Sequence, residues 1–221
     1  KVPAEQPFMA TSCCPSWSVM AKKLFPQFKD YISMAMTPMV LTARLYKKDH
    51  PDVRIVFIGP CTAKKLEASR RTVRSDVDFV LTFEEMQGIF DAKGIVPAEM
   101  PVDPEEEFGT GTALGRGFAV TGGVANAVKE AIAELDPDRE VKVEHADGLR
   151  EGRKMLAMAK AGKRNGYLLE GMACPGGCVA GAGTIRPVKK STAAVGKYVA
   201  GAKVRTIQDS AAVKRLREVQ D

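Results

Sequence analysis

The chain alternates short runs of β-branched and apolar residues with longer amphipathic stretches. Strands are predicted at residues 53–58, 78–81, 141–145 and 167–170, and helices at residues 62–69, 82–90, 124–135 and 149–161. Such an alternation is typical of α/β folds, because parallel strands need a crossover connection that is usually a helix. We therefore expect an α/β fold in which mostly parallel sheets are flanked by helices.

Local signals set the predicted boundaries. Thr82 is a suitable N-cap for the helix that follows it, and Pro137 ends the helix at residues 124–135. Residues 97–117 are rich in proline, glycine and acidic residues, which favours a long loop. The chain from Ser191 onward looks helical and polar. We therefore expect a main unit at residues 1–190 and a helical C-terminal extension at residues 191–221.

Five cysteines stand out against this background, namely Cys13, Cys14, Cys61, Cys174 and Cys178. Their number is odd and too low for a disulfide scaffold, and a chain of 221 residues is long enough to fold without disulfides. They form three groups, and each group follows an apolar run that reads as a strand. In open α/β sheets, ligand sites form outside the carboxyl ends of the strands. The cysteines are therefore placed where a ligand site is expected.

Thiolates are preferred ligands of soft metals and iron–sulfur clusters. Cys174 and Cys178 enclose a Pro-Gly-Gly sequence, which we expect to let the backbone approach a bulky ligand. Simpler explanations exist, because a cysteine such as Cys61 is often a small core residue. The only histidines, His50 and His145, lie in unrelated settings, which disfavours a mixed Cys/His zinc site. The cysteines alone thus leave open an iron–sulfur cluster, a zinc site or a purely structural role.

Composition excludes several other classes of function. The net charge is +6, and basic residues occur in short groups with acidic residues between them, while aromatic residues make up 6%. This pattern is typical of a solvated surface, and we expect no nucleic-acid binding. No apolar run approaches the ~20 residues of a membrane span, and the first residues lack the apolar region of a signal peptide. We expect a cytoplasmic protein of an anaerobic prokaryote that does not bind membranes.

Three segments carry a specific resemblance. They are TSCCPSW at Thr11–Trp17, GPCTAKKLEA at Gly59–Ala68 and EGMACPGGCVAGAG at Glu170–Gly183. In the same order, they resemble the TSCCPxW, PCxxKKxE and ExMACxxGCxxGGG segments of the [FeFe]-hydrogenase family. The resemblance extends over about residues 7–190 and implies the C-terminal part of the domain that holds the H-cluster, within a two-lobed fold.

The resemblance implies a ligand set and a cofactor. Cys14, Cys61, Cys174 and Cys178 match the four cysteines that hold a [4Fe-4S] cluster in that family. The match of Cys178 also bridges to a two-iron subcluster that carries CO, cyanide and an azadithiolate. The implied reaction is the reversible reduction of protons to H2. The implied partners are H2 and protons, ferredoxin or accessory iron–sulfur domains, dedicated maturation proteins and the upstream lobe of the same protein.

The resemblance also implies roles for further residues. Cys13 matches the cysteine that passes protons to the azadithiolate amine, and Lys64 matches the lysine that donates a hydrogen bond to a cyanide ligand. Met172 matches a methionine near the two-iron site. Glu67 matches a carboxylate of the proton relay, and Ser33 falls near the serine of that relay. These assignments are expectations that follow from the resemblance alone.

Two departures from the family pattern keep alternatives open. Catalytic members commonly have Ser-Pro-Gln-Gln where this chain has Thr-Pro-Met-Val, so Met39 replaces a hydrogen-bond donor, and Gly59 stands where methionine is common. Both changes resemble H2-sensing members of low turnover. A non-enzymatic iron–sulfur assembly protein of the same family is disfavoured by Cys13, which such relatives generally lack, and a zinc-stabilised α/β protein remains the simplest alternative. The missing upstream lobe suggests a fragment or one half of a split protein.

Overall fold

The computed structural model describes residue 2 and residues 4–101, 111–211 and 213. The strands are β1 (Phe8–Ala10), β2 (Val56–Gly59), β3 (Phe79–Thr82), β4 (Lys142–Asp147) and β5 (Tyr167–Met172). The α-helices are α1 (Pro15–Leu24), α2 (Pro38–Asp49), α3 (Ala63–Ala68), α4 (Phe83–Lys93), α5 (Ala113–Arg116), α6 (Gly123–Leu135), α7 (Leu149–Lys160) and α8 (Val188–Ala200). Short 3-10 helices are η1 (Pro26–Tyr31), η2 (Pro97–Glu99), η3 (Gly117–Ala119) and η4 (Cys178–Ala180).

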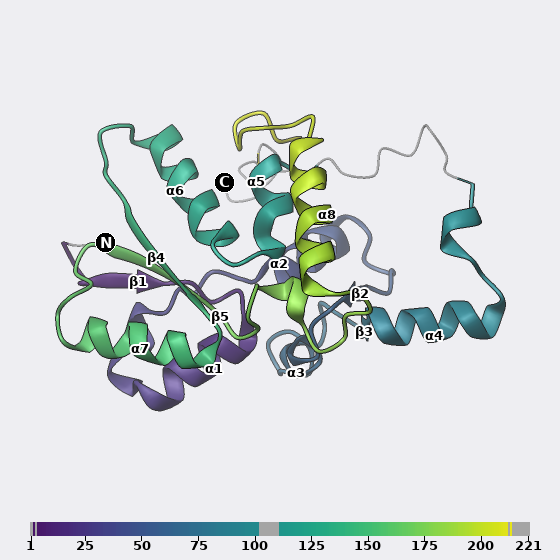
Figure 1. Cartoon of the computed structure of the whole chain (residues 1–221), viewed down its shortest axis with the longest axis horizontal. Helices are drawn as coiled ribbons and strands as arrows, with labels where there is room; N and C mark the ends of the chain where they lie inside the picture. The colour runs from purple at the N-terminus through teal and green to yellow at the C-terminus, as the bar shows by residue number, and fades with distance from the viewer. Residues whose placement is uncertain (1, 3, 102–110, 212, 214–221) are drawn as a thin grey trace.

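Within the described residues, the strands form two separate parallel sheets. Sheet A has the order β1-β5-β4, and sheet B consists of β2 and β3. Figure 1 shows the strands of sheet A on the left and those of sheet B nearer the centre, with helices around both. The expected α/β fold with parallel sheets flanked by helices is therefore confirmed.

Sheet A is packed between helices. α1 and α7 contact it on one side, and α6 contacts β4 and β5 on the other (Figure 1). Phe8, Trp17, Leu156 and Leu169 form the centre of its core and are fully buried. The Trp17 ring leaves no room for side chains beside it, because a Cβ added at Gly171 would lie 2.1 Å from the ring. Burial of such large apolar side chains is the main stabilising contribution to this part of the fold.

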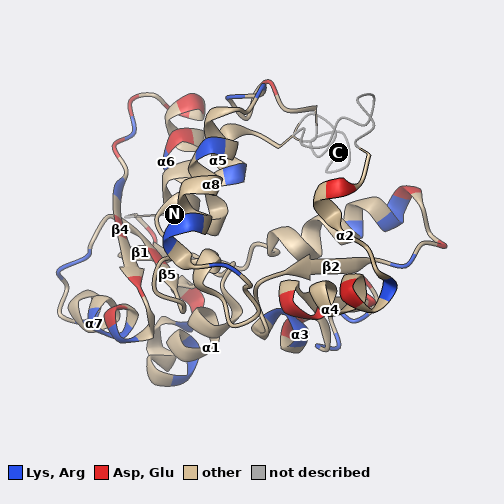
Figure 2. Cartoon of the chain, turned by 45° about the vertical axis from the view of Figure 1, so that its right-hand side comes forward, with Lys and Arg blue, Asp and Glu red and all other residues tan. Residues whose placement is uncertain are grey.

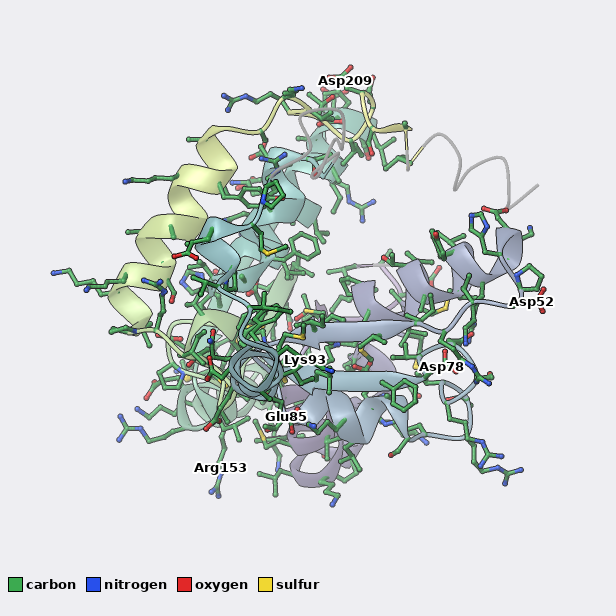
Figure 3. The ribbon with its side chains drawn as sticks, turned by 90° about the vertical axis from the view of Figure 1, so that its right-hand side faces the viewer. Asp52, Asp78, Glu85, Lys93, Arg153 and Asp209 are labelled. Atoms are coloured by element: carbon green, nitrogen blue, oxygen red, sulfur yellow. The ribbon has the colours of Figure 1, made fainter. Side chains whose placement is uncertain are left out.

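Sheet B is covered by α2, and ion pairs anchor this helix to it. Met39 and Val40 of α2 are buried in a cluster that includes Phe57 and Val80 of the sheet. The Asp78 carboxylate accepts hydrogen bonds from Lys47 Nζ at 2.7 Å and from Arg54 at 3.0 Å. Figure 3 shows α2 along the two strands and Asp78 beside them.

The other face of sheet B is only partly covered, although α3 and α4 contact its strands. Val56 and Phe79 lie opposite each other in the register, and they are 45% and 60% exposed. Ile58, on the same face, is 44% exposed. Parallel sheets are normally covered on both faces, so this surface is unusual for a complete α/β domain.

The predicted elements differ from the observed ones mainly at their ends. β2 begins at Val56 rather than at residue 53, and α4 continues to Lys93. The predicted loop at 97–117 contains a 3-10 turn and the short helix α5, and its residues 102–110 lie outside the described part of the chain. The predicted division after residue 190 falls inside α8, and residues 212 and 214–221 of the predicted extension also lie outside the description.

α8 is attached to the rest of the fold. The Arg116 guanidinium donates a hydrogen bond to the Tyr198 carbonyl at 3.0 Å and lies 4.1 Å from the centre of the Tyr198 ring. Basic and acidic residues are mixed along the helices (Figure 2), and exposed ion pairs such as Lys154–Glu151 join some of them. Across the described residues, no helix is both long and apolar enough to span a membrane.

Candidate metal centre

The five cysteines follow the carboxyl ends of strands from both sheets. Cys13 and Cys14 come after β1, and Cys14 is the N-cap residue of α1, where its carbonyl accepts the Ser18 N–H at 3.0 Å. Cys174 and Cys178 come after β5, which pairs in parallel with β1. Parallel neighbours end on the same edge of a sheet, so these two groups share one edge. Cys61 follows β2, in the other sheet.

Residues 174–183, which we call the bridging segment, connect the two sheets. The Gly183 N–H donates to the Pro60 carbonyl at 2.9 Å, and the Gly183 carbonyl accepts from the Glu84 N–H at 3.2 Å. A Cβ at Gly181 would lie 2.4 Å from the Pro60 oxygen, so the backbones touch at that point. This contact brings the Cys61 loop to the loop that holds Cys178.

The thiols are close enough to affect one another electrostatically. Burial raises the pKa of Cys178 to about 12, and the nearby thiols of Cys14 and Cys61 add to the shift. Burial, together with Cys14 and Cys61, also raises the pKa of Cys174. Coulomb interactions weaken with distance, so these shifts indicate that the four predicted ligands face a common region. A positively charged metal group stabilises thiolates in such a setting, so the donor set fits a soft metal cluster.

The described side chains do not converge into a binding site for a single zinc ion. A structural zinc site needs about four ligands at ~2.0–2.3 Å from one point. Within the described ranges, no group of three or more His, Cys, Asp and Glu side chains is close enough to hold one metal ion.

The glycines around Cys178 make close contacts with the chain itself. Their expected approach to a bulky ligand stays a prediction. Gly176 and Gly177 have φ values of +99° and +94°, which side chains rarely adopt. A Cβ at Gly177 would also lie 2.7 Å from the Ala119 carbonyl oxygen. These residues therefore shape the bridging segment and let it pack against η3.

Cys13 lies beside the predicted ligands in a partly buried setting. Burial raises the pKa of its thiol to about 11, with smaller contributions from Glu170 and Cys14, while the Lys64 ammonium opposes the shift. The thiol is therefore protonated at neutral pH in this environment.

Lys64 and Glu67 form a buried ion pair next to Cys13. Lys64 Nζ lies 2.6 Å from Glu67 Oε2 and 3.3 Å from the Cys13 carbonyl oxygen. The two residues are 9% and 4% exposed. The structure thus brings Lys64 to the predicted site, and it places the Glu67 carboxylate against the lysine.

Met172 and Ser33 are the other two residues that were predicted to belong to the site. Met172 ends β5 and is 3% exposed, while the Ser33 hydroxyl accepts the Ala35 N–H at 3.2 Å. No hydrogen bond found among the described residues joins Ser33 to Glu67 or to Cys13. The expected relay is therefore not connected in this structure, and its assignment remains a prediction.

Sequence reasoning missed the structural role of Glu170. This residue is fully buried, and its two carboxylate oxygens accept the Gly122 N–H at 2.9 Å and the Ala125 N–H at 2.6 Å. Burial raises the pKa of Glu170, and these hydrogen bonds partly oppose the shift. An acidic residue inside the otherwise apolar run of β5 was the available signal, because a buried carboxylate needs partners.

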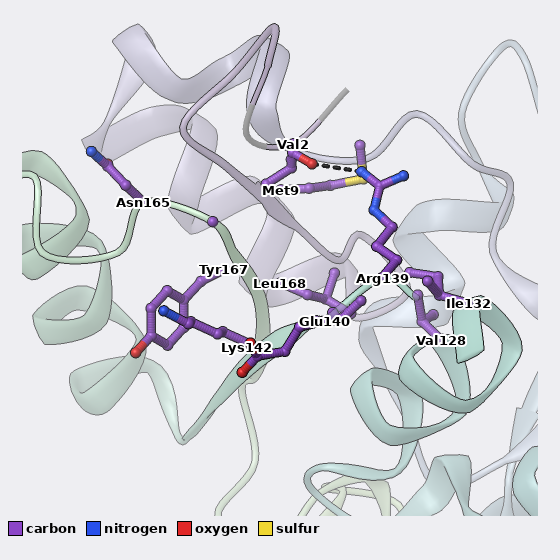
Figure 4. A pocket seen from close by; sticks show the side chains of 12 residues that line it. Val2, Met9, Val128, Ile132, Arg139, Glu140, Lys142, Asn165, Tyr167 and Leu168 are labelled. Atoms are coloured by element: carbon purple, nitrogen blue, oxygen red, sulfur yellow. Dashed lines mark hydrogen bonds between the residues drawn. The ribbon is translucent and has the colours of Figure 1, made fainter. Parts of the chain in front are cut away.

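Two cavities lie at different distances from the cysteines. One of about 640 Å³ lies at the amino ends of the strands of sheet A, away from the cysteines, and is lined by Met9, Leu168 and Ile132 (Figure 4). Another, of about 730 Å³, is mostly apolar and is lined by Cys178 together with Phe83 and other residues. Of the five cysteines, Cys178 alone lines the second cavity, and none lines the first.

Comparisons with known proteins agree with these observations. The sequence model of a family described as "Iron only hydrogenase large subunit, C-terminal domain" matches residues 1–182. The periplasmic [Fe] hydrogenase large subunit of Nitratidesulfovibrio vulgaris is 31% identical over 212 residues, which cover 78% of this chain and 50% of that protein. A probable cytosolic Fe-S cluster assembly factor of Aedes aegypti is also 31% identical, covering 82% of this chain and 48% of that protein.

Solved structures have the same fold. The [FeFe]-hydrogenase HydA1 from Chlamydomonas reinhardtii, in a variant form, superposes with a TM-score of 0.74 at 23% identity and covers 95% of this chain and 71% of that one. The [FeFe]-hydrogenase structure of HydA(deltaEFG) gives a TM-score of 0.72 at 26% identity. The chain spans about half the length of the curated relatives it matches, and these relatives include both hydrogenases and assembly factors. With its cysteine motifs, its parallel sheets and a family match over residues 1–182, this chain belongs to the iron-only hydrogenase large-subunit family, in the region of the C-terminal domain.

Proposed function

We propose that the chain is part of a hydrogenase H-cluster domain, in which Cys14, Cys61, Cys174 and Cys178 hold a [4Fe-4S] cluster. The observation that carries the proposal is that these thiols follow strands of two different sheets and are brought together by the bridging segment. When bound, a two-iron subcluster with CO, cyanide and azadithiolate ligands would supply the reversible reduction of protons to H2, and Cys178 would help to hold it.

The chain's own residues have separate tasks in this proposal. The Cys13 thiol carries a proton between the two-iron site and the protein. The Lys64 ammonium donates a hydrogen bond to an anionic ligand, a task that suits a buried cation. Met172, buried at the end of β5, excludes water from the same region. Ser33 stays a candidate for the outer part of the proton path, whereas the Glu67 carboxylate is bonded to Lys64.

The exposed apolar side chains of Val56, Ile58 and Phe79 on sheet B support a larger assembly. We propose that residues 1–190 are the C-terminal part of the domain, that the extension to residue 221 begins within α8, and that an upstream lobe completes the site. Ferredoxin or accessory iron–sulfur domains would deliver electrons, and dedicated maturation proteins would insert the two-iron part. We propose a cytoplasmic location for this protein.

Infrared spectroscopy of the full-length protein, matured with the two-iron cofactor, tests the proposal. Bands from bound CO and cyanide are expected together with H2 turnover. A correctly matured sample without these bands would contradict a hydrogenase-type function. A protein that binds the [4Fe-4S] cluster but never accepts the two-iron part would instead match the non-enzymatic assembly relatives.

Substitutions separate the ligands from the proton carrier. Replacing any one of Cys14, Cys61, Cys174 and Cys178 with alanine is expected to lower the iron content. Cys13→Ser is expected to leave the iron content unchanged and to remove most H2 turnover, because a serine hydroxyl holds its proton far more tightly than a thiol does. Loss of iron in Cys13→Ser would show that the ligands are misassigned.

A second candidate function is H2 sensing with low turnover. Met39, which stands where catalytic relatives commonly have glutamine, is 6% exposed and packs with Val73 and Val77 in the apolar cluster under α2. This position offers no amide donor to the metal site. The sensory function predicts low H2 turnover even at full cofactor occupancy, whereas a rate like that of ordinary catalytic members would exclude it.

A further inference from the structure

The Lys64–Glu67 pair has a geometry that a proton relay does not require. The two residues stand three positions apart on α3, and Nζ lies 2.6 Å from Oε2 in a nearly buried setting. The same Nζ donates to the Cys13 carbonyl at 3.3 Å. The ammonium therefore connects α3 to the loop that holds Cys13 and Cys14.

The number of hydrogen bonds that the Lys64 ammonium can donate determines how far the ion pair restricts its orientation. A lysine ammonium has three N–H donors, and the described structure records two acceptors for that of Lys64. With two acceptors fixed, the direction of the third donor is restricted. A buried cation without a carboxylate partner is strongly disfavoured, and Glu67 supplies that partner to Lys64.

We propose that Glu67 is a positioning residue: it holds the Lys64 ammonium in a fixed orientation, so that the remaining N–H is presented to an anionic ligand at the metal centre. The carboxylate does not carry protons in this proposal. It is bonded to Lys64, and no recorded hydrogen bond in the described ranges connects it to Cys13 or Ser33. The inference rests on the proposed function of the site, because the anionic ligand is the cyanide of the two-iron subcluster.

The test uses the full-length protein loaded with the [4Fe-4S] cluster and compares Glu67→Gln, Lys64→Met and the double variant. The affinity for the synthetic two-iron cofactor and the cyanide infrared bands are measured. Each single variant is expected to weaken cofactor binding by about tenfold, the effect of one lost charge-assisted hydrogen bond. Both are expected to shift the cyanide bands in the same direction. The double variant is expected to behave like Lys64→Met alone, because residues that act as a unit are not additive.

The neighbouring surface pair provides matched controls. Lys65 Nζ lies 2.8 Å from the Glu85 carboxylate, and these side chains are 41% and 45% exposed. Lys65→Met and Glu85→Gln remove the same kinds of groups from the adjacent lysine and its partner, and glutamine retains the capping interaction of Glu85 with α4. Both controls are expected to leave the cyanide bands and cofactor affinity unchanged.

Two outcomes would overturn the proposal. Unchanged cyanide bands in Glu67→Gln, together with a changed pH profile of H2 turnover, would assign proton transfer to Glu67. A double variant whose loss equals the sum of the single losses would show that Glu67 acts independently of Lys64.

A cofactor-free measurement separates failure of this inference from failure of the proposed function. Amine-reactive labelling of Lys64, followed by mass spectrometry with exposed Lys154 as the internal reference, is expected to increase at least about tenfold in Glu67→Gln, because the buried pair protects the amine. Unchanged labelling would overturn the positioning role. If labelling increases and the wild-type protein shows no cyanide bands, the pair is confirmed and the proposed function fails.

Discussion

The two sheets of this chain differ in how completely they are covered. Sheet A has helices on both sides, and Phe8, Trp17 and Leu169 in its core are fully buried. Sheet B has one face under α2, whereas on its other face Phe79 is 60% exposed. The chain therefore contains one sheet that helices cover on both faces and one sheet with a partly exposed face.

This difference coincides with the distribution of the cysteines. Four of the five follow strands of sheet A, and Cys61 alone follows a strand of sheet B. The better-packed region thus supplies most of the proposed ligands, while the last ligand depends on the bridging segment. The comparison suggests that the stability of sheet A and the placement of sheet B can be perturbed separately.

The largest expected change in the free energy of unfolding follows from removing the Trp17 ring from the core of sheet A. Trp17→Ala should lower the free energy of unfolding by about 3–5 kcal/mol, because it removes a fully buried ring between Gly171 and Gly152. Circular dichroism during urea unfolding measures this, since Trp17 is the only tryptophan and fluorescence is lost with it.

Phe79→Ala is the matched change on sheet B. It should cost less than about 1 kcal/mol in this chain, because the removed ring is mostly exposed. A cost equal to that of Trp17→Ala would contradict the comparison between the sheets. A larger cost in the full-length protein than in this chain would indicate that another part of the protein covers this face.

An effect between those of Trp17→Ala and Phe79→Ala is expected where Glu170 of sheet A contacts the start of α6. Glu170→Ala should lower the free energy of unfolding by about 2 kcal/mol, because the buried N–H groups of Gly122 and Ala125 lose their acceptors. Hydrogen exchange of these two amides locates the effect. Unchanged protection at both amides would show that Glu170 does not anchor this helix.

The stability contributions of Glu170 in sheet A and Asp78 beside sheet B should change with pH in opposite directions. Burial raises the pKa of Glu170 above 4.5, so its contribution to stability is complete below that value and is lost as the pH rises through the folded pKa. Lys47, the Ile55 N–H and Arg54 lower the pKa of Asp78 below 3.8, so its contribution is present above that value and is lost as the pH falls.

Unfolding curves of Glu170→Gln and Asp78→Asn across the acid range measure these contributions. The difference between wild type and Asp78→Asn should shrink below pH 3.8, the ordinary aspartate value. Relative to Glu170→Gln, the wild type should lose stability as the pH rises from 4.5. The same sign for both residues would be inconsistent with the environments described for the two sheets.

Another small effect is expected at the junction between sheet B and α4. Thr82 and Glu85 form a capping box, in which the Thr82 hydroxyl accepts the Glu85 N–H at 3.1 Å. Thr82→Ala should lower the free energy of unfolding by about 1 kcal/mol, the usual effect of losing a helix cap. Thr82→Ser retains the hydroxyl and serves as the control, so equal losses in both variants would point to packing against Gly183 instead.

Much of the fold follows from the sequence pattern. The alternation of strands and helices predicted the parallel sheets, and Thr82 was identified as an N-cap, a role it has in the structure. Element ends were less accurate, because β2 begins three residues later than predicted, where pairing with Phe79 starts. The separation into two sheets was not predicted, since pairing between distant strands depends on tertiary contacts that no local pattern encodes.

The site was predictable in outline but not in its contacts. The positions of the cysteines after the strands indicated a shared ligand region, because parallel strands end at one edge. The Lys64–Glu67 pair and the anchoring role of Glu170 were not predicted, since both depend on partners that only the folded chain brings together. The same holds for the glycines near Cys178, whose close neighbours are distant in sequence.

The bridging segment has a consequence for how the proposed cluster assembles. Its hydrogen bonds to Pro60 and Glu84 hold the Cys61 loop beside Cys178 through protein contacts alone. The entropy cost of closing the long loops between the ligands is then met during folding rather than during iron binding. The thiols consequently have a high effective concentration for one another, and iron can enter a chain that is already folded.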